Sequence, residues 1–136
     1  MNKKYVLDAS ALLHFVEDDV GAERMERLIK EAVHRRTPLL MSVVNWGEVF
    51  YHEWQHRDEQ TARRTMAGLA RLPLKLLPVD LLQSEKAGEL KAVHKIPYVD
   101  CLAAALASLQ QATLVTSDRD FEKLGRHFPI LWIARP

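Results

Sequence analysis

Short apolar runs alternate along the chain with longer segments whose apolar residues recur at helical spacing. The apolar runs are rich in Leu, Ile, Val and Thr and are bounded by turn-forming or charged residues, a pattern typical of buried strands. The predicted strands cover residues 4–7, 38–41, 74–79, 113–116 and 130–133.

The segments between these runs predict helices with identifiable beginnings. Residues 21–36 form an amphipathic segment, and Pro97 directly precedes a helix that starts near Tyr98. Residues 118–124 predict a short helix. The remaining helices each begin with a side chain that can cap them: Ser10 before residues 11–16, Ser42 before a helix reaching about residue 56, Asp58 before a helix reaching residue 72, and Asp80 before a helix reaching about residue 94.

Alternation of strands and helices favours an α/β domain in which helices cover both faces of a parallel sheet. The expected architecture is a three-layer α/β/α fold with about five strands. With 136 residues, and without a repeat or a linker, the chain is expected to form one domain over residues 1–136.

Composition narrows the class of protein. The chain is 48% hydrophobic and 27% charged, which is typical of a globular protein, and no apolar run approaches the roughly 20 residues needed to span a bilayer. Its first residues lack the apolar stretch of a signal peptide, so a cytoplasmic location without a membrane partner is expected. Cys101 is the only cysteine, which excludes an internal disulfide and a thiolate metal cage.

Acidic residues stand beside several of the apolar segments. Asp8 and Asp118 follow predicted strands, and Asp100 opens an Ala-rich helix. Parallel α/β sheets bind ligands at the carboxyl ends of their strands, so Asp8 and Asp118 are expected at the same edge. A carboxylate next to a core element is usually paired or bound to metal, and Mg²⁺ or Mn²⁺ prefers such oxygen ligands.

Glu48 lies in a hydrophobic stretch, and a helical wheel indicates which face of the predicted helix it occupies. At 100° per residue, one broad apolar arc contains Val43, Val44, Trp46, Val49, Phe50, Tyr51 and Trp54. The narrower opposite stripe contains Asn45, Glu48, His52, Gln55 and His56. Glu48 therefore belongs to a polar face that either lines a pocket or simply faces solvent.

Four segments together resemble a known family, and the resemblance extends over essentially the whole chain. The segments are residues 5–10 with Asp8 and Ser10, residues 45–49 with Asn45 and Glu48, residues 98–107 with Asp100, and residues 116–121 with Thr116, Asp118 and Asp120. In order and spacing they resemble PIN domains, most of all the VapC-type toxins of bacterial and archaeal toxin–antitoxin pairs. Cys101 is a departure, because such proteins often carry Ala at that position.

The resemblance implies strand order 3-2-1-4-5 and a Mg²⁺-dependent endoribonuclease, with Mn²⁺ as an alternative ion, that is inhibited by a partner antitoxin and forms a homodimer. It implies that Asp8, Glu48, Asp100 and Asp118 are catalytic, and that Asp8, Asp100 and Asp118 ligate the metal. It implies secondary or substrate contacts for Ser10, Thr116, Asn45 and His52, and for Asp120 a second acidic position that varies in the family.

A rival motif lies within one of these helices. His52-Glu53-Trp54-Gln55-His56 matches the H-E-x-x-H pattern of zinc peptidases, in which both histidines lie on one helix face. A third ligand is required, and Glu59, Glu85 and Glu89 are candidates. The extension found in metzincins is absent, and the motif is short enough to occur by chance.

Other readings of the acidic residues are weaker. Haloacid dehalogenase-like phosphatases place a second Asp two residues after the first, where this chain has Ser10. A phospho-acceptor receiver domain needs an acceptor Asp after its third strand, where Asp80 begins a helix instead. An inactive PIN-like module that only binds RNA or protein remains the non-enzymatic alternative.

Two further features bear on partners. The net charge is only +1, but basic residues concentrate in the first half and could contact a phosphate backbone: Arg24, Arg27, Lys30, Arg35, Arg36, Arg57, Arg63 and Arg64. Apolar residues that could form a groove for an antitoxin helix or a dimer are Leu12, Phe15, Val16, Trp46, Phe50, Tyr51 and Trp54. Core packing is the competing explanation for most of them.

Overall fold

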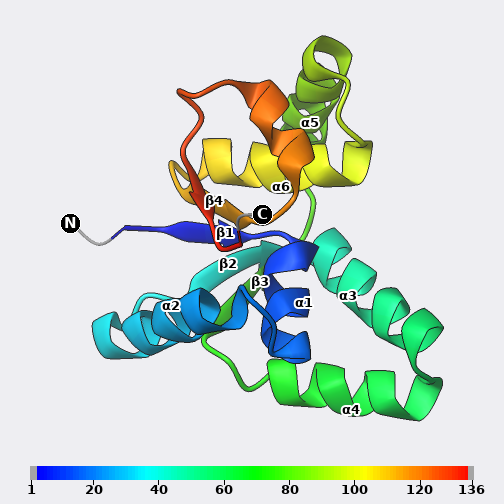
Figure 1. Cartoon of the computed structure of the whole chain (residues 1–136). Helices are drawn as coiled ribbons and strands as arrows, with labels where there is room; N and C mark the ends of the chain where they lie inside the picture. The colour runs from blue at the N-terminus through cyan, green and yellow to red at the C-terminus, as the bar shows by residue number, and fades with distance from the viewer. Residues whose placement is uncertain (1–2, 135–136) are drawn as a thin grey trace.

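One sheet of parallel strands separates two layers of helices in the computed structural model, which describes residues 3–134 (Figure 1). Its strands are β1 (Tyr5–Leu7), β2 (Leu39–Ser42), β3 (Leu74–Leu77), β4 (Thr113–Thr116) and β5 (Ile130–Trp132). Every neighbouring pair is parallel, and the order is β3-β2-β1-β4-β5. The α/β class and the strand order are therefore confirmed. Met1, Asn2, Arg135 and Pro136, the ends of the expected 1–136 domain, lie outside the described residues.

The helices divide between the two faces of the sheet (Figure 1). One face is covered by α5 (Leu81–His94), α6 (Tyr98–Leu109) and the 3₁₀ helix η1 (Arg119–Leu124). The other side carries α1 (Ala9–Glu17), α2 (Ala22–Arg35), α3 (Val43–His56) and α4 (Glu59–Leu69). Within the described part of the chain, no helix has both the length and the apolarity that crossing a membrane requires.

Alternation along the central strands supplies both cores. Val6 of β1 packs into the layer of α5 and α6, while the next residue, Leu7, packs into the layer of α1 and α2. All seven residues from Cys101 to Ala107 of α6 are buried, and most of them are alanines. Small side chains let α6 lie close to the sheet, which brings its first turn, with Asp100, near the ends of the central strands.

Helix capping follows the sequence at three positions and departs from it at one. Ser42, Asp58 and Asp80 cap α3, α4 and α5, as expected. The expected cap at Ser10 is wrong, because α1 begins at Ala9 and its cap is Asp8, which accepts a hydrogen bond from the backbone of Ala11. β1 and α1 are thus joined by a single residue, and that residue is the acidic one.

The buried and exposed sides of α3 also differ from those that the helical wheel predicts. Its buried line consists of Asn45, Val49 and Glu53, whereas Tyr51 and Trp54, assigned to the apolar arc, are exposed. The physical reason is that α3 leaves the sheet and packs beside α1 and α4, so its neighbours there are helices rather than the apolar sheet (Figure 1).

Truncation of Phe121 is expected to destabilise the fold strongly. This ring in η1 is fully buried in the core of the α6 layer, so Phe121→Ala should lower the free energy of unfolding by about 3–5 kcal/mol in urea titrations. Leu81→Ala, at a side chain that is 76% exposed, is the control and should change it by less than about 0.5 kcal/mol. Equal effects of the two truncations would contradict the packing described.

Candidate functional site

Four acidic side chains meet at the carboxyl edge of the sheet, beside its central strands β1 and β4. Asp8 follows β1, Asp118 follows β4 by two residues, Asp100 lies in the first turn of α6, and Glu48 lies in α3, which follows β2. The charges of Asp118, Asp8 and Glu48 all act on Asp100, so the four carboxyl groups share one neighbourhood. The structure thus brings together residues that are up to 110 positions apart (from 8 to 118).

Asp8 is the most rigidly held of the four. It is 4% exposed, and its Oδ1 accepts hydrogen bonds from the Ser10 hydroxyl at 2.7 Å and the Ala11 N–H at 3.0 Å, while Oδ2 accepts one from the Thr116 hydroxyl at 2.5 Å. Burial raises the pKa of Asp8 to about 6, although the hydrogen bonds from Thr116, Ser10 and Ala11 act in the opposite direction. Ser10 and Thr116 therefore both donate hydrogen bonds to the first of the four acids.

Asp100 has a pKa that is raised further than that of Asp8, by burial and by the charges of its neighbours. Burial raises its pKa first of all, the charges of Asp118, Asp8 and Glu48 raise it further, and a hydrogen bond with the Asp118 carboxyl adds to the effect, which brings the pKa of Asp100 to about 7. This carboxyl group therefore keeps its proton to a higher pH than an exposed aspartate does. A nearby cation would favour its ionised form.

Glu48 is held by a neighbour on the same helix. Its Oε1 accepts a hydrogen bond from Asn45 Nδ2 at 2.7 Å, and burial followed by the charge of Asp118 raises the pKa of Glu48. Asn45 itself is fully buried, and its Oδ1 has no hydrogen-bond partner among the described residues. Glu48 therefore faces the other acids, which excludes the simple solvent-exposed reading of the polar stripe.

Asp120 lies close to two of the four acids, Asp100 and Asp118. Asp100, Asp118 and Asp120 each offer a carboxylate oxygen, and these oxygens lie within 4.8 Å of one another. The Asp120 N–H donates to Asp118 Oδ1 at 2.9 Å, which fixes the turn that carries both acids. Asp8 is outside this group of three. An all-oxygen donor set of carboxylates suits a hard divalent cation such as Mg²⁺.

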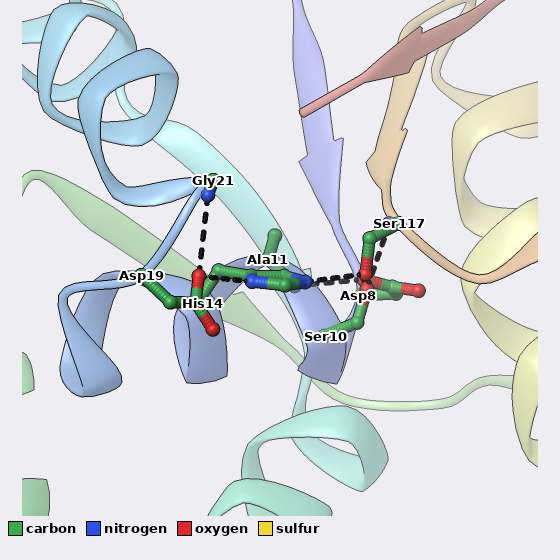
Figure 2. A network of polar contacts seen from close by, with 7 residues as sticks. All are labelled: Asp8, Ser10, Ala11, His14, Asp19, Gly21 and Ser117. Carbon is green, nitrogen blue, oxygen red and sulfur yellow. Dashed lines mark hydrogen bonds and ion pairs between the residues drawn. The ribbon is translucent and has the colours of Figure 1, made fainter. Parts of the chain in front are cut away.

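A second polar network, which the sequence did not reveal, joins α1 to the loop after β4 (Figure 2). The His14 Nε2 bonds to the Ser117 hydroxyl at 2.7 Å, and its Nδ1 bonds to Asp19. The backbone N–H of Ser117 donates to the Ser10 hydroxyl at 3.0 Å, and Ser10 donates to Asp8. The chain of contacts from Asp19 to Asp8 anchors the residue next to Asp118. The only sequence signal was that His14 follows Ser10 by one helical turn.

His52 lies one turn beyond Glu48 on α3. Its ring stacks on that of His56, with centroids 4.0 Å apart. The His52 side chain shares a potential metal-binding group with Glu17 and Glu53, whereas His56 and the third ligands considered above, Glu59, Glu85 and Glu89, do not belong to that group. Over residues 3–134, His56 therefore does not join His52 in a group of three potential ligands, as an H-E-x-x-H zinc site would require.

Replacement of Asp100 by an uncharged amide is expected to stabilise the metal-free protein at neutral and higher pH. Folded Asp100 keeps its proton up to about pH 7, while the unfolded chain releases it near pH 4, so wild-type stability falls as pH rises through this interval. Asp100→Asn should therefore raise the Tm at pH 8 in EDTA by on the order of a few degrees, and the gain should shrink steadily toward pH 4.

The matched control is Asp80→Asn, which keeps a capping side chain on α5 outside the site. Its Tm should run parallel to that of the wild type across the same pH series. A gain for Asp100→Asn that does not depend on pH would contradict the electrostatic account.

Comparison with known proteins identifies solved structures with a similar fold and the family to which the chain belongs. None of the curated protein sequences is significantly similar to the chain. Among solved structures, VapBC2 from Rickettsia felis bound to a promoter DNA fragment aligns with TM-score 0.77 at 15% identity, over 93% of this chain and 96% of that one. DNA-bound VapBC from Salmonella typhimurium aligns with TM-score 0.74 at 16% identity, over 98% and 100%. Mycobacterium tuberculosis VapC20, a sarcin–ricin loop cleaving toxin, aligns with TM-score 0.72 at 16% identity, over 90% and 95%. The sequence pattern of the PIN domain matches residues 5–127, and the chain therefore belongs to the PIN domain family.

Proposed function

We propose that this PIN domain is a Mg²⁺-dependent endoribonuclease, with Mn²⁺ as an alternative ion, and that it acts as the toxin of a toxin–antitoxin pair in the cytoplasm. The observation that carries the proposal is the meeting of four carboxyl groups, of which Asp8, Glu48 and Asp100 have raised pKa values. Such a cluster is unfavourable in the absence of a cation. A scaffold that only binds RNA would be more stable without it.

The donor set fits a divalent cation. Asp100 and Asp118 would hold it together with Asp8, directly or through water, and Asp120 lies close enough to contribute. When bound, such an ion supplies Lewis-acid stabilisation of the charge that develops on a phosphodiester during hydrolysis. Every group named as a ligand is an oxygen of Asp, which explains the choice of Mg²⁺ or Mn²⁺ over softer metals.

The chain's own residues supply orientation and proton transfer. Asn45 holds Oε1 of Glu48, so Oε2 is the oxygen that we assign to accept a proton from the attacking water. The raised pKa of Glu48 makes it a better base than an exposed glutamate. Ser10 and Thr116 keep the Asp8 carboxylate in one orientation.

RNA would approach over basic residues, but several of these are partly neutralised. Lys30, Arg35, Arg57 and Arg63 each pair with a glutamate one turn earlier in the chain. Arg24 donates to the carbonyl oxygen of Trp132 at 2.5 Å. Among the basic residues named above, we assign a direct phosphate contact to Arg27 and Arg36, because the charge of Arg64 already acts on Asp58.

The antitoxin would bind the exposed apolar side of α3 and α4. Trp46, Gly47, Phe50, Arg63 and Met66 line a surface hollow of about 310 Å³, and Tyr51 and Trp54 lie exposed on the same helix. Leu12, by contrast, is fully buried and serves the core. The VapBC proteins from R. felis and S. typhimurium were crystallised bound to DNA, which supports a DNA-binding partner protein here. A homodimer is the assembly that we propose for the toxin itself.

Cleavage of RNA by the purified protein is the direct test. Mg²⁺ or Mn²⁺ should support cleavage and EDTA should abolish it, and both Asp8→Asn and Asp100→Asn should lower the rate by roughly 10²-fold or more while the circular dichroism spectrum stays native. Asp80→Asn is the matched control and should cleave at the wild-type rate. RNA binding without cleavage would instead identify the inactive PIN-like module, and metal-dependent cleavage of a peptide would identify a peptidase.

The toxin role has a separate test in cells. Expression of the wild-type chain should arrest growth, and Asp100→Asn should not. Co-expression of a cognate antitoxin, to be sought as a small DNA-binding protein encoded beside this gene, should restore growth. Trp54→Asp should keep the arrest but weaken the rescue, because it places a charge on the apolar side of α3. If the wild-type chain cleaves RNA but never arrests growth, the toxin role is overturned and the protein is a housekeeping nuclease.

A further inference from the structure

A second group of metal-ligating side chains lies where the end of α1 meets α3. Glu17 is the last residue of α1, and His52 and Glu53 lie in the second half of α3. Each offers one ligand atom, and these atoms lie within 4.8 Å of one another. None of the three residues belongs to the carboxylate site, and the group combines an imidazole with two carboxylates.

Glu53 is a buried carboxylate with little to compensate its charge. Its side chain is 1% exposed. Its two nearer partners both contact Oε1: the Thr65 hydroxyl at 3.3 Å and Arg57 Nε at 3.7 Å. Its Oε2 faces His52 Nδ1 at 3.9 Å, which is too long for a hydrogen bond. A buried anion with partners this distant loses more hydration energy than it recovers, unless a cation lies close to it.

His52 supplies an independent observation. Its Nδ1 atom is buried and has no hydrogen-bond partner among the described residues. Buried ring nitrogens are normally paired with a protein group, a water or an ion. The Nδ1 atom of His52 lies on the side of the ring that faces the buried Glu53 carboxylate, at 3.9 Å from Oε2.

We propose that Glu17, His52 and Glu53 form a binding site for a transition-metal ion, with Zn²⁺ as the ion of choice. Imidazole suits Zn²⁺ better than Mg²⁺, and carboxylate oxygens complete the set of protein ligands that Zn²⁺ commonly takes. The site accounts for both the unpaired Nδ1 and the weakly paired Glu53. Because its ligands come from α1 and α3, the role of the ion is structural: it joins the last residue of α1 to the second half of α3, and these two helices also carry Asp8 and Glu48.

Zn²⁺ titration of the chelator-treated protein tests this site. Asp100→Asn serves as the background, so that the carboxylate site contributes less to the measured binding. Isothermal titration should give one Zn²⁺ per chain, and Zn²⁺ should raise the Tm of this background protein. Adding Glu17→Gln or His52→Ala should weaken binding at least tenfold and abolish most of the Tm shift. In ¹⁵N spectra of the histidine rings, Zn²⁺ should shift Nδ1 of His52.

The controls separate this site from its neighbours. His56→Ala removes a ring that stacks on His52 but bonds through its own Nδ1 to the His52 carbonyl oxygen at 2.9 Å, and Glu59→Gln removes an exposed carboxylate paired with Arg63. Both variants should keep Zn²⁺ affinity within about threefold of the background. Glu17 is exposed, so its variant should fold even if a change at buried Glu53 does not.

Three results would overturn the proposal. They are no Zn²⁺ binding in the Asp100→Asn background, undiminished binding in Glu17→Gln and His52→Ala, and loss of binding in His56→Ala equal to that in His52→Ala. None of these readouts involves RNA cleavage, so the outcome is independent of the nuclease assignment.

Discussion

Repulsion among the carboxyl groups at the edge of the sheet is the constraint on which the rest of the structure depends. Folding places Asp8, Asp100, Asp118 and Glu48 in one neighbourhood although each loses hydration and gains like-charged neighbours. The opposing free energy comes from the two cores on either side of the sheet. Register in the central strands is strict, because a slip of one residue would exchange Val6 and Leu7 between the two layers. The acids therefore cannot separate without loss of core packing, and protons or a cation must relieve the repulsion.

The two acids with the largest shifts show which physical effect dominates at each position. Asp8 is the more deeply buried, yet its pKa reaches only about 6, whereas that of half-buried Asp100 reaches about 7. Hydroxyl and backbone donors stabilise the ionised form of Asp8. Asp100 instead receives the charges of three other acids, and its contact with Asp118 favours the protonated form. Asp8 is thus an orienting anion, while Asp100 is the group whose ionisation depends most on a cation.

The sequence predicted the parts of this arrangement that depend on local order. The strand at residues 113–116 and the capping of α3, α4 and α5 follow from runs of a few residues, and the carboxyl ends of parallel strands account for Asp8 and Asp118. Strand order came from the family resemblance. Ser10 was misassigned as a cap because Asp8 and Ser10 are both capping residues two positions apart. The choice between them depends on where β1 ends.

The parts that could not be predicted depend on contacts between distant segments. A helical wheel describes α3 alone, so it could not show that Asn45 and Glu53 are buried while Tyr51 and Trp54 remain exposed. His14, Asp19 and Ser117 come from three segments, and each residue by itself reads as an ordinary polar surface position. Only the fold shows that they continue the hydrogen bonds of Ser10 toward α2.

α1 and α3 connect the two clusters of ligating side chains. α1 is capped by Asp8 and ends at Glu17, while α3 carries Glu48 and, one turn later, His52 and Glu53. The angle between these helices therefore sets the distance from Glu48 to the other acids and, at the same time, the distance from Glu17 to His52. An ion held by Glu17 and His52 would resist changes in that angle. Since the charge of Asp118 acts on both Asp8 and Glu48, a contact between Glu17 and His52 would hold the two helices together against the repulsion within the carboxylate site.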